Sequence, residues 1–137
     1  MIINHITFIC QDIQRSAALF CDLFKAVEIY SSEENTFSLS QEKFLLIDNL
    51  WVALMQGPSQ SQSYNHVAFT VTEEELPLLQ AKIEAWDLKI VPGRARKPEE
   101  GQSLYFFDFD NHLFELHTGD LKTRLNFYMR ARSNEKR

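Results

Sequence analysis

The feature of this sequence that most restricts its fold is a repeat with a period of 61 residues. The pentapeptide NHITF at residues 4–8 returns as NHVAF at residues 65–69, so that His5 has a counterpart in His66. Solenoid proteins repeat a shorter unit many times, whereas this long unit occurs only twice. The repeat therefore predicts two related modules, each too small to bury both faces of a sheet alone, that pack together as a single domain over residues 1–137.

Each pentapeptide is followed by a segment with the periodicity of an amphipathic helix. Residues 12–26 and 72–87 place apolar side chains at steps of three and four, which brings them to one helix face. Asp12 is a predicted N-cap, and Thr72 with Glu75 forms a predicted capping box, although a nearby proline leaves that boundary open by a few residues. The apolar positions are Ile13, Ala17, Phe20 and Phe24 in the first segment and Leu76, Leu79, Ile83 and Trp86 in the second.

Short apolar runs after each helix are typical of strands. We read each half as strand–helix–strand–strand–strand, which predicts an α+β fold of two βαβββ modules, at about residues 1–58 and 64–119. A closing helix at about residues 120–131 is expected to begin at Asp120 as its N-cap. The strand-like runs are 25–32, 36–41, 43–48 and 50–56 in the first half and 88–93, 103–109 and 112–118 in the second.

The charge and composition of the chain argue against two classes of partner. A net charge of −5 lacks the basic excess usual in nucleic-acid binding. No run approaches the ~18 apolar residues that cross a membrane, and the N-terminal residues do not resemble a signal peptide. The two cysteines fit a reduced, cytoplasmic protein, and Cys21 is read as a small apolar residue on a helix face rather than a nucleophile.

A third residue joins the two repeated histidines as a candidate metal ligand. Glu115 lies within an apolar run, where an ionised carboxylate is costly unless it is paired or bound to a metal. The shift of 61 residues places Glu115 on Leu54, which we interpret as a fourth, vacated position of a symmetric site. Two imidazoles and one carboxylate with open positions are typical of catalytic Mn²⁺, Fe²⁺ or Zn²⁺ sites. Whether His5 and His66 meet within one chain or across a dimer is left open, as is the role of His117, which shares a strand face with Glu115.

Two stretches carry a resemblance to a known family. Residues 104–125, LYFFDFDNHLFELHTGDLKTRL, are similar to the C-terminal signature of fosfomycin-resistance proteins in the vicinal-oxygen-chelate superfamily, which also includes glyoxalase I and extradiol dioxygenases. Residues 36–54, TFSLSQEKFLLIDNLWVAL, are similar to the branch that hydrolyses the fosfomycin epoxide with water. The resemblance covers the chain to about residue 128.

The resemblance implies a site shared between two chains. Family members are homodimers whose modules pair across chains in a domain-swapped manner, so each site would draw its metal ligands, among His5, His66 and Glu115, from both subunits. The implied cofactor is Mn²⁺, with other divalent metals possible, and Glu42 matches the general base. By the repeat shift Glu42 corresponds to Ser103. Positions that match substrate contacts are Thr7, Trp51, Tyr64, Arg94, Ser103, Tyr105 and Arg124, with Arg96 as the alternative to Arg94 in the intervening loop.

The implied activity is hydrolysis of fosfomycin, a small epoxide that carries a phosphonate. Water activated by Glu42 would attack the phosphonate-bearing carbon to give a diol, and this would confer resistance. Thiol transfer from glutathione or bacillithiol is the nearest alternative, and a related phosphonate epoxide is an alternative substrate. An extradiol dioxygenase and a metal-free protein that sequesters the drug are more distant alternatives.

Overall fold

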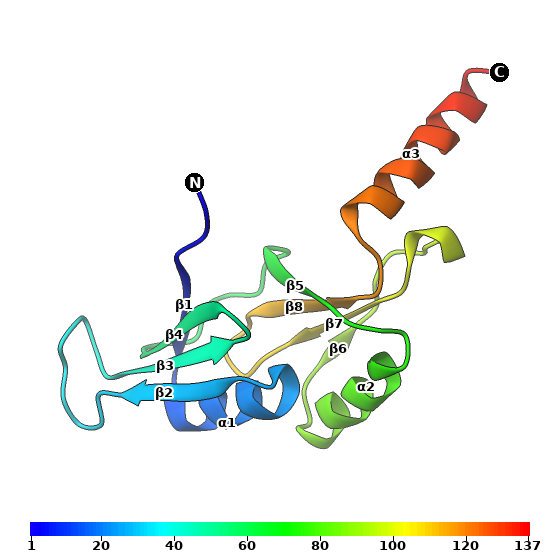
Figure 1. Cartoon of the computed structure of the whole chain (residues 1–137). Helices are drawn as coiled ribbons and strands as arrows, with labels where there is room; N and C mark the ends of the chain where they lie inside the picture. Colours follow the sequence, from blue (N-terminus) through cyan, green and yellow to red (C-terminus); the bar gives the residue numbers. More distant parts are fainter.

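A computed structural model describes residues 1–137 and contains two consecutive βαβββ modules followed by a helix (Figure 1). The α+β fold predicted from the repeat is confirmed. The first module comprises β1 (His5–Cys10), α1 (Ile13–Phe24), β2 (Val27–Ser31), β3 (Glu42–Ile47) and β4 (Leu50–Gln56). The second comprises β5 (His66–Thr70), α2 (Glu75–Ala85), β6 (Ile90–Val91), the 3₁₀ turn η1 (Pro98–Glu100), β7 (Ser103–Phe107) and β8 (Leu113–His117), and α3 (Leu121–Glu135) closes the chain.

Helices α1 and α3 begin at their predicted N-caps, and α2 begins at Glu75, within the few residues that the sequence left open. The side chain of Asp12 accepts a hydrogen bond from the backbone of α1, and that of Asp120 accepts one from the backbone of α3. Thr72 and Glu75 exchange side-chain-to-backbone hydrogen bonds of 2.9 and 3.1 Å, which is the predicted capping box. The closing helix continues to Glu135, beyond the predicted end at about residue 131. None of these helices combines the length and the apolar character that crossing a bilayer requires.

Two of the predicted strands are wrong or shortened. Residues 36–41 form a loop of bends, because Phe37 and Leu39 point into solvent with exposed fractions of 73% and 91% and no neighbouring strand pairs with them. Of residues 88–93, only the two residues of β6 pair with β7. Alternation of apolar residues predicted strands in both runs, but a strand also needs a neighbouring strand to pair with, and most of these residues have none.

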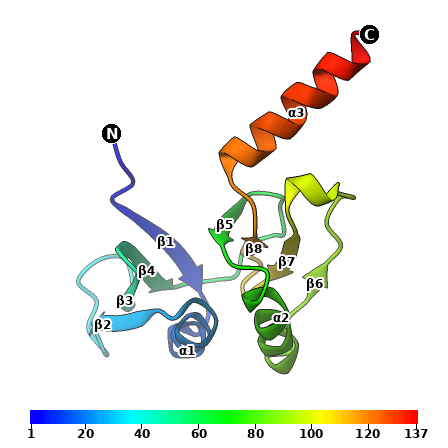
Figure 2. The same ribbon diagram turned by 45° about the vertical axis from the view of Figure 1, so that its right-hand side comes forward.

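Each module forms its own four-stranded sheet, and the two sheets share one core. The strand orders are β1-β4-β3-β2 and β5-β8-β7-β6, so β1 and β5 are edge strands. The helices α1 and α2 lie side by side against the two sheets (Figure 2). Phenylalanines join the modules, since the ring of Phe8 lies 5.5 Å from Phe114 and that of Phe24 lies 4.6 Å from Phe69. The opposite face of each sheet, which we call its open face, carries the candidate site residues.

The strand register corrects the position that the repeat shift assigned to Leu54. Glu115 pairs with Ala68, and the equivalent pair in the first module is Ala53 with Thr7. Leu54 is fully buried on the helix-facing side of its sheet instead. The shift is 61 residues at the start of each module. The equivalent pairs Leu46 with Trp51 and Phe107 with Leu113 enclose four and five residues, so the connection in the second module has one extra residue. One inserted residue exchanges the two sheet faces, so Ala53 is the true counterpart of Glu115.

The longer β7–β8 turn also joins the two modules. Asp110, only 1% exposed, accepts hydrogen bonds from the backbone of Gln11 in the first module at 3.0 Å and from the hydroxyl of Ser59 in the linker at 2.6 Å. Asn111, at a positive φ of 67°, donates from its side chain to the carbonyl of Gln60 at 2.7 Å. These bonds hold the linker that leads into β5.

We predict that Asp110→Ala lowers the free energy of unfolding by about 2–4 kcal/mol, because it leaves the Ser59 hydroxyl and the Gln11 amide without their acceptor. Urea denaturation followed by circular dichroism measures this change. As a matched control, Glu34→Ala removes an exposed carboxylate and should change stability by less than ~0.5 kcal/mol. Equal stability of the two variants would show that the joint is not stabilising.

Candidate metal and anion site

The open face of the second sheet brings His66 and Glu115 together. The Nδ1 of His66 lies 2.7 Å from the carbonyl oxygen of Tyr64, which can only accept, so Nδ1 carries the proton. The Nε2 of His66 then faces Oε1 of Glu115 at 3.3 Å. In a neutral imidazole this nitrogen carries a lone pair, so both atoms can bind the same cation. Two ligands ~2.0–2.2 Å from one metal at about a right angle are about 3 Å apart, so this pair fits a divalent metal.

Glu115 is ionised despite its burial. Glu115 is only 4% exposed and lies between the core residues Phe114 and Leu116 on β8. Burial raises the pKa of this carboxyl group, but hydrogen bonds from Ser103 and Tyr105 and the charge of Arg96 help to lower it below its usual value. The shortest contact is the Ser103 hydroxyl to Oε2, at 2.6 Å. The carboxylate therefore keeps its negative charge, as a metal ligand must.

The third candidate ligand, His5, lies apart from this pair. It is exposed on β1, where its ring stacks on Trp51 with centroids 4.3 Å apart and its Nδ1 lies 2.7 Å from the side-chain oxygen of Asn4. A single chain contains no group of three or more His, Cys, Asp or Glu side chains placed to hold a metal together. Within this chain His5 therefore does not join His66 and Glu115.

Glu42 lies on the same open face as His5, at the first residue of β3. The register pairs Glu42 with Met55 and His5 with Trp51. Met55 and Trp51 are four residues apart on β4, so their side chains and those of their partners lie on one face. The backbone of Glu42 is fixed from both sides by Ser32, whose hydroxyl accepts from the Glu42 N–H at 2.9 Å and whose N–H donates to the Glu42 carbonyl at 3.0 Å. The carboxylate itself has no hydrogen-bond or ion-pair partner in the chain, which leaves it free to accept a proton. The equivalence of Glu42 with Ser103 agrees with the register.

The loop before β7 supplies a cation to the site, but from Arg96 rather than Arg94. The guanidinium of Arg94 binds Glu100 at 2.7 Å and the hydroxyl of Tyr128 at 2.9 Å, and so points toward α3. Arg96 instead contacts Oε2 of Glu115 at 3.3 Å and the hydroxyl of Tyr105 at 3.0 Å. Its Nε and Nη1 are buried without a partner. A sequence cannot show which of two arginines a loop turns inward, so the choice of Arg94 was not supported by any local pattern.

Three further candidates surround the same face. Arg124, from the first turn of α3, lies 3.4 Å from Nε2 of His117. Tyr64 stacks on Tyr105 with centroids 6.3 Å apart, and burial raises the pKa of Tyr105 to about 12, so its phenol keeps its proton.

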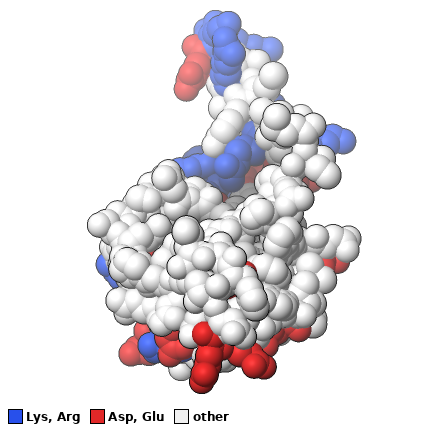
Figure 3. Space-filling model, turned by 90° about the vertical axis from the view of Figure 1, so that its left-hand side faces the viewer, with Lys and Arg blue, Asp and Glu red and all other residues white.

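Basic side chains gather between α3 and the body of the molecule, whereas acidic side chains gather at the opposite end (Figure 3). The positive region favours an anionic ligand. Thr7, by contrast, lies on the first sheet beside His5.

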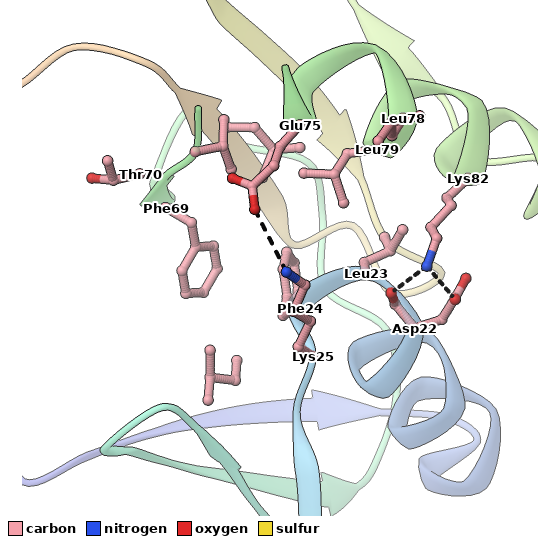
Figure 4. Close-up of a pocket in the computed structure, with 13 residues that line it drawn as sticks. Asp22, Leu23, Phe24, Lys25, Phe69, Thr70, Glu75, Leu78, Leu79 and Lys82 are labelled. Carbon is pink, nitrogen blue, oxygen red and sulfur yellow. Dashed lines mark hydrogen bonds and ion pairs between the residues drawn. The ribbon is translucent and has the colours of Figure 1, made fainter. Parts of the chain in front are cut away.

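A separate cavity at the junction of the modules contains none of these residues. Its volume is about 330 Å³, and it is lined by apolar side chains of α1, α2 and β5, among them Leu23, Phe69 and Leu79 (Figure 4). Two ion pairs cross its rim, Lys25 with Glu75 at 3.5 Å and Lys82 with Asp22 at 2.8 Å. These pairs join one module to the other, and the chemistry of the site lies elsewhere.

Comparisons with known proteins agree with this geometry. The profile of the glyoxalase/bleomycin resistance protein/dioxygenase superfamily matches residues 2–116. The fosfomycin resistance protein FosX of Listeria monocytogenes is 48% identical over 92% of this chain and 96% of its own. A crystal structure of a mutant of that protein, complexed with Mn(II) and 1S,2S-dihydroxypropylphosphonic acid, superposes with a TM-score of 0.84 over 93% of this chain and 99% of its own, at 44% identity. The metallothiol transferase FosB of Staphylococcus saprophyticus is 32% identical over 98% of this chain and 87% of its own.

We predict that Arg96→Gln weakens binding of inorganic phosphate about 10- to 100-fold, because a buried charge-assisted contact contributes roughly 1.5–3 kcal/mol. Arg94→Gln is the matched control, and we expect it to change phosphate affinity less than threefold because its guanidinium is already paired with Glu100. Isothermal titration calorimetry with Mn²⁺ present measures both affinities. A larger loss in Arg94→Gln than in Arg96→Gln would reverse the assignment.

Proposed function

Because this chain belongs to the glyoxalase/bleomycin resistance protein/dioxygenase superfamily, we propose that it is a Mn²⁺-dependent hydrolase that opens the epoxide of fosfomycin to a diol and so confers resistance. The observation that carries this proposal is the facing pair of His66 Nε2 and Glu115 Oε1, beside a partly unpaired buried guanidinium. A metal site and an anion site thus adjoin, as an epoxide that bears a phosphonate requires. When bound, the metal supplies a Lewis acid for the epoxide oxygen.

The second module binds and orients the substrate. Arg96 and Arg124 hold the phosphonate by charge-assisted hydrogen bonds, and the neutral phenol of Tyr105 adjoins them. The Ser103 hydroxyl lies beside this anion site and donates to Glu115. Tyr64, stacked on Tyr105, covers this face from the linker. Holding the phosphonate fixes the adjacent carbon relative to the attacking water.

The first module supplies the base. Glu42 takes a proton from water while the water oxygen forms a bond to the phosphonate-bearing carbon and the carbon–oxygen bond of the ring breaks. The released oxygen takes a proton from solvent to become the second hydroxyl of the diol, and Glu42 returns its proton to solvent. Its unpaired carboxylate and its fixed backbone both support this role. Thr7 and the ring of Trp51 line the same face.

The separation of the two groups of residues supports a homodimer with shared sites. His5 and Glu42 lie on one open face, and His66 and Glu115 lie on the other, and no hydrogen bond, ion pair or ring contact joins the two groups within the chain. A domain-swapped dimer would set the first open face of one chain against the second open face of its partner. We also propose a cytoplasmic location, which the two free cysteines support.

We predict that Glu42→Gln lowers the rate of fosfomycin hydrolysis about 10²- to 10⁴-fold, since it removes the general base but keeps the size of the side chain. Phosphorus NMR follows the conversion of the epoxide to the diol. Glu34→Gln, an exposed change in the preceding loop, should keep the wild-type rate. Wild-type hydrolysis by Glu42→Gln would remove Glu42 from the mechanism.

The same assay separates hydrolysis from thiol transfer, which is the second candidate because the metallothiol transferase FosB is also similar to this chain. We expect diol as the main product with or without added glutathione or bacillithiol. A thiol-dependent adduct as the main product, identified by mass spectrometry, would favour transfer instead.

Shared sites predict complementation between two inactive variants. His5→Ala and His66→Ala should each lose Mn²⁺ binding and turnover as homodimers. A mixed dimer, purified with two affinity tags, should regain one intact site of its two, because one site then receives both histidines. Sites built within single chains would leave the mixed dimer as inactive as its parents.

A further inference from the structure

We propose that His117 is a positioning residue that couples anion binding at Arg124 to metal binding at Glu115. The inference rests on the proposed function, because it takes the metal and phosphonate sites from there. Its basis is a chain of hydrogen bonds from Arg124 through His117 and Ser103 to the carboxylate.

The chemistry of the end groups fixes the direction of every bond in this chain. Arg124 can only donate, so Nε2 of His117, 3.4 Å away, accepts. The Nδ1 of the same ring lies 3.1 Å from the backbone carbonyl oxygen of Gln102, which can only accept, so Nδ1 carries the proton. The imidazole is therefore neutral and holds a single tautomer.

Ser103 relays this orientation to the metal ligand. Its hydroxyl oxygen lies 2.7 Å from the protonated Nδ1 of His117 and accepts from it, so its own proton points to Oε2 of Glu115, 2.6 Å away. Oε2 is thereby occupied by Ser103 and by Arg96, and Oε1 is left facing the unprotonated nitrogen of His66. The chain thus selects which carboxylate oxygen is free to bind a metal.

Two glycines keep the imidazole in place. A Cβ at Gly119 would lie 2.7 Å from Nε2 of His117, and a Cβ at Gly101 would lie 2.9 Å from the backbone nitrogen of Gly119. Gly101 also has a φ of +79°, which disfavours other residues. The His117 side chain is only 12% exposed as a result. The ring therefore has one position, between the first turn of α3 and the open face of the sheet.

The repeat provides an internal comparison. The register makes Met55 the counterpart of His117 and Glu42 the counterpart of Ser103, on the sheet where Ala53 replaces the carboxylate. The relay is thus present only in the module that contains Glu115. If His117 served only to end a strand, it would not need the Ser103 hydroxyl as its cross-strand neighbour.

The experiment compares His117→Leu, which can neither donate nor accept, with His117→Gln, which can do both. The affinity for Mn²⁺ is measured by electron paramagnetic resonance, with and without saturating inorganic phosphate. We expect His117→Leu to weaken Mn²⁺ binding about 10- to 100-fold and to reduce the enhancement of Mn²⁺ affinity by phosphate at least threefold. His117→Gln should restore most of both effects. Arg130→Gln, which changes a charge further along α3, is the control and should match wild type.

A second pair of variants keeps the test decisive if His117→Leu does not fold. Ser103→Ala breaks the same relay at its next bond, and Ser103→Ala combined with His117→Ala should be no weaker in Mn²⁺ binding than Ser103→Ala alone. Additive losses, or equal losses in His117→Leu and His117→Gln, would overturn the proposal. These readings need no fosfomycin, so a protein that couples phosphate to Mn²⁺ without hydrolysing fosfomycin would contradict the proposed function and leave this inference standing.

Discussion

One buried carboxylate organises the second half of this molecule. An ionised Glu115 inside an apolar strand would cost several kcal/mol without partners, because protein interiors solvate charge poorly. The fold meets this cost with the Ser103 hydroxyl and the Arg96 guanidinium, each on a neighbouring element. Those partners are themselves polar groups brought to a sheet face that would otherwise be apolar. The same residues that stabilise the carboxylate therefore create a place for a cation and, next to it, a place for an anion.

The two modules have diverged at the positions where chemistry is needed. The register sets Ala53 against Glu115 and Glu42 against Ser103. One open face retains a histidine and a base, and the other retains a histidine, a carboxylate and the cations. Neither face forms a complete site alone, whereas the two are complementary. The shared phenylalanine core lies on the helix-facing side of both sheets, opposite the open faces. The proposed pairing between chains would bring the two complementary faces together.

Much of the fold was predictable from the sequence because local signals agreed with one another. The helix caps at Asp12 and Asp120 and the capping box at Thr72 each rest on bonds within four residues, which a sequence displays directly. The doubled pentapeptide made His5 and His66 equivalent, and the strand register agrees. The identification of Leu54 was wrong because a single extra residue in a turn reverses a strand face, and no local pattern reveals the register. The inward turn of Arg96 depends on tertiary contacts with Tyr105, which a linear pattern does not contain.

Hydrolysis and thiol addition to an epoxide share a metal, an anion site and a leaving oxygen, so the second module serves either reaction equally well. The two reactions differ in the nucleophile that attacks the epoxide carbon. In the proposed dimer the first module of the partner chain lines the path of that nucleophile. Water needs a base at the point of attack, whereas a thiolate arrives already deprotonated and needs room for a much larger molecule. Glu42 provides a free carboxylate at that point, held by two backbone hydrogen bonds to Ser32 rather than by its own side chain. In the proposed mechanism this carboxylate would activate water and repel an approaching thiolate. One residue at the start of β3 would then decide which nucleophile the scaffold uses.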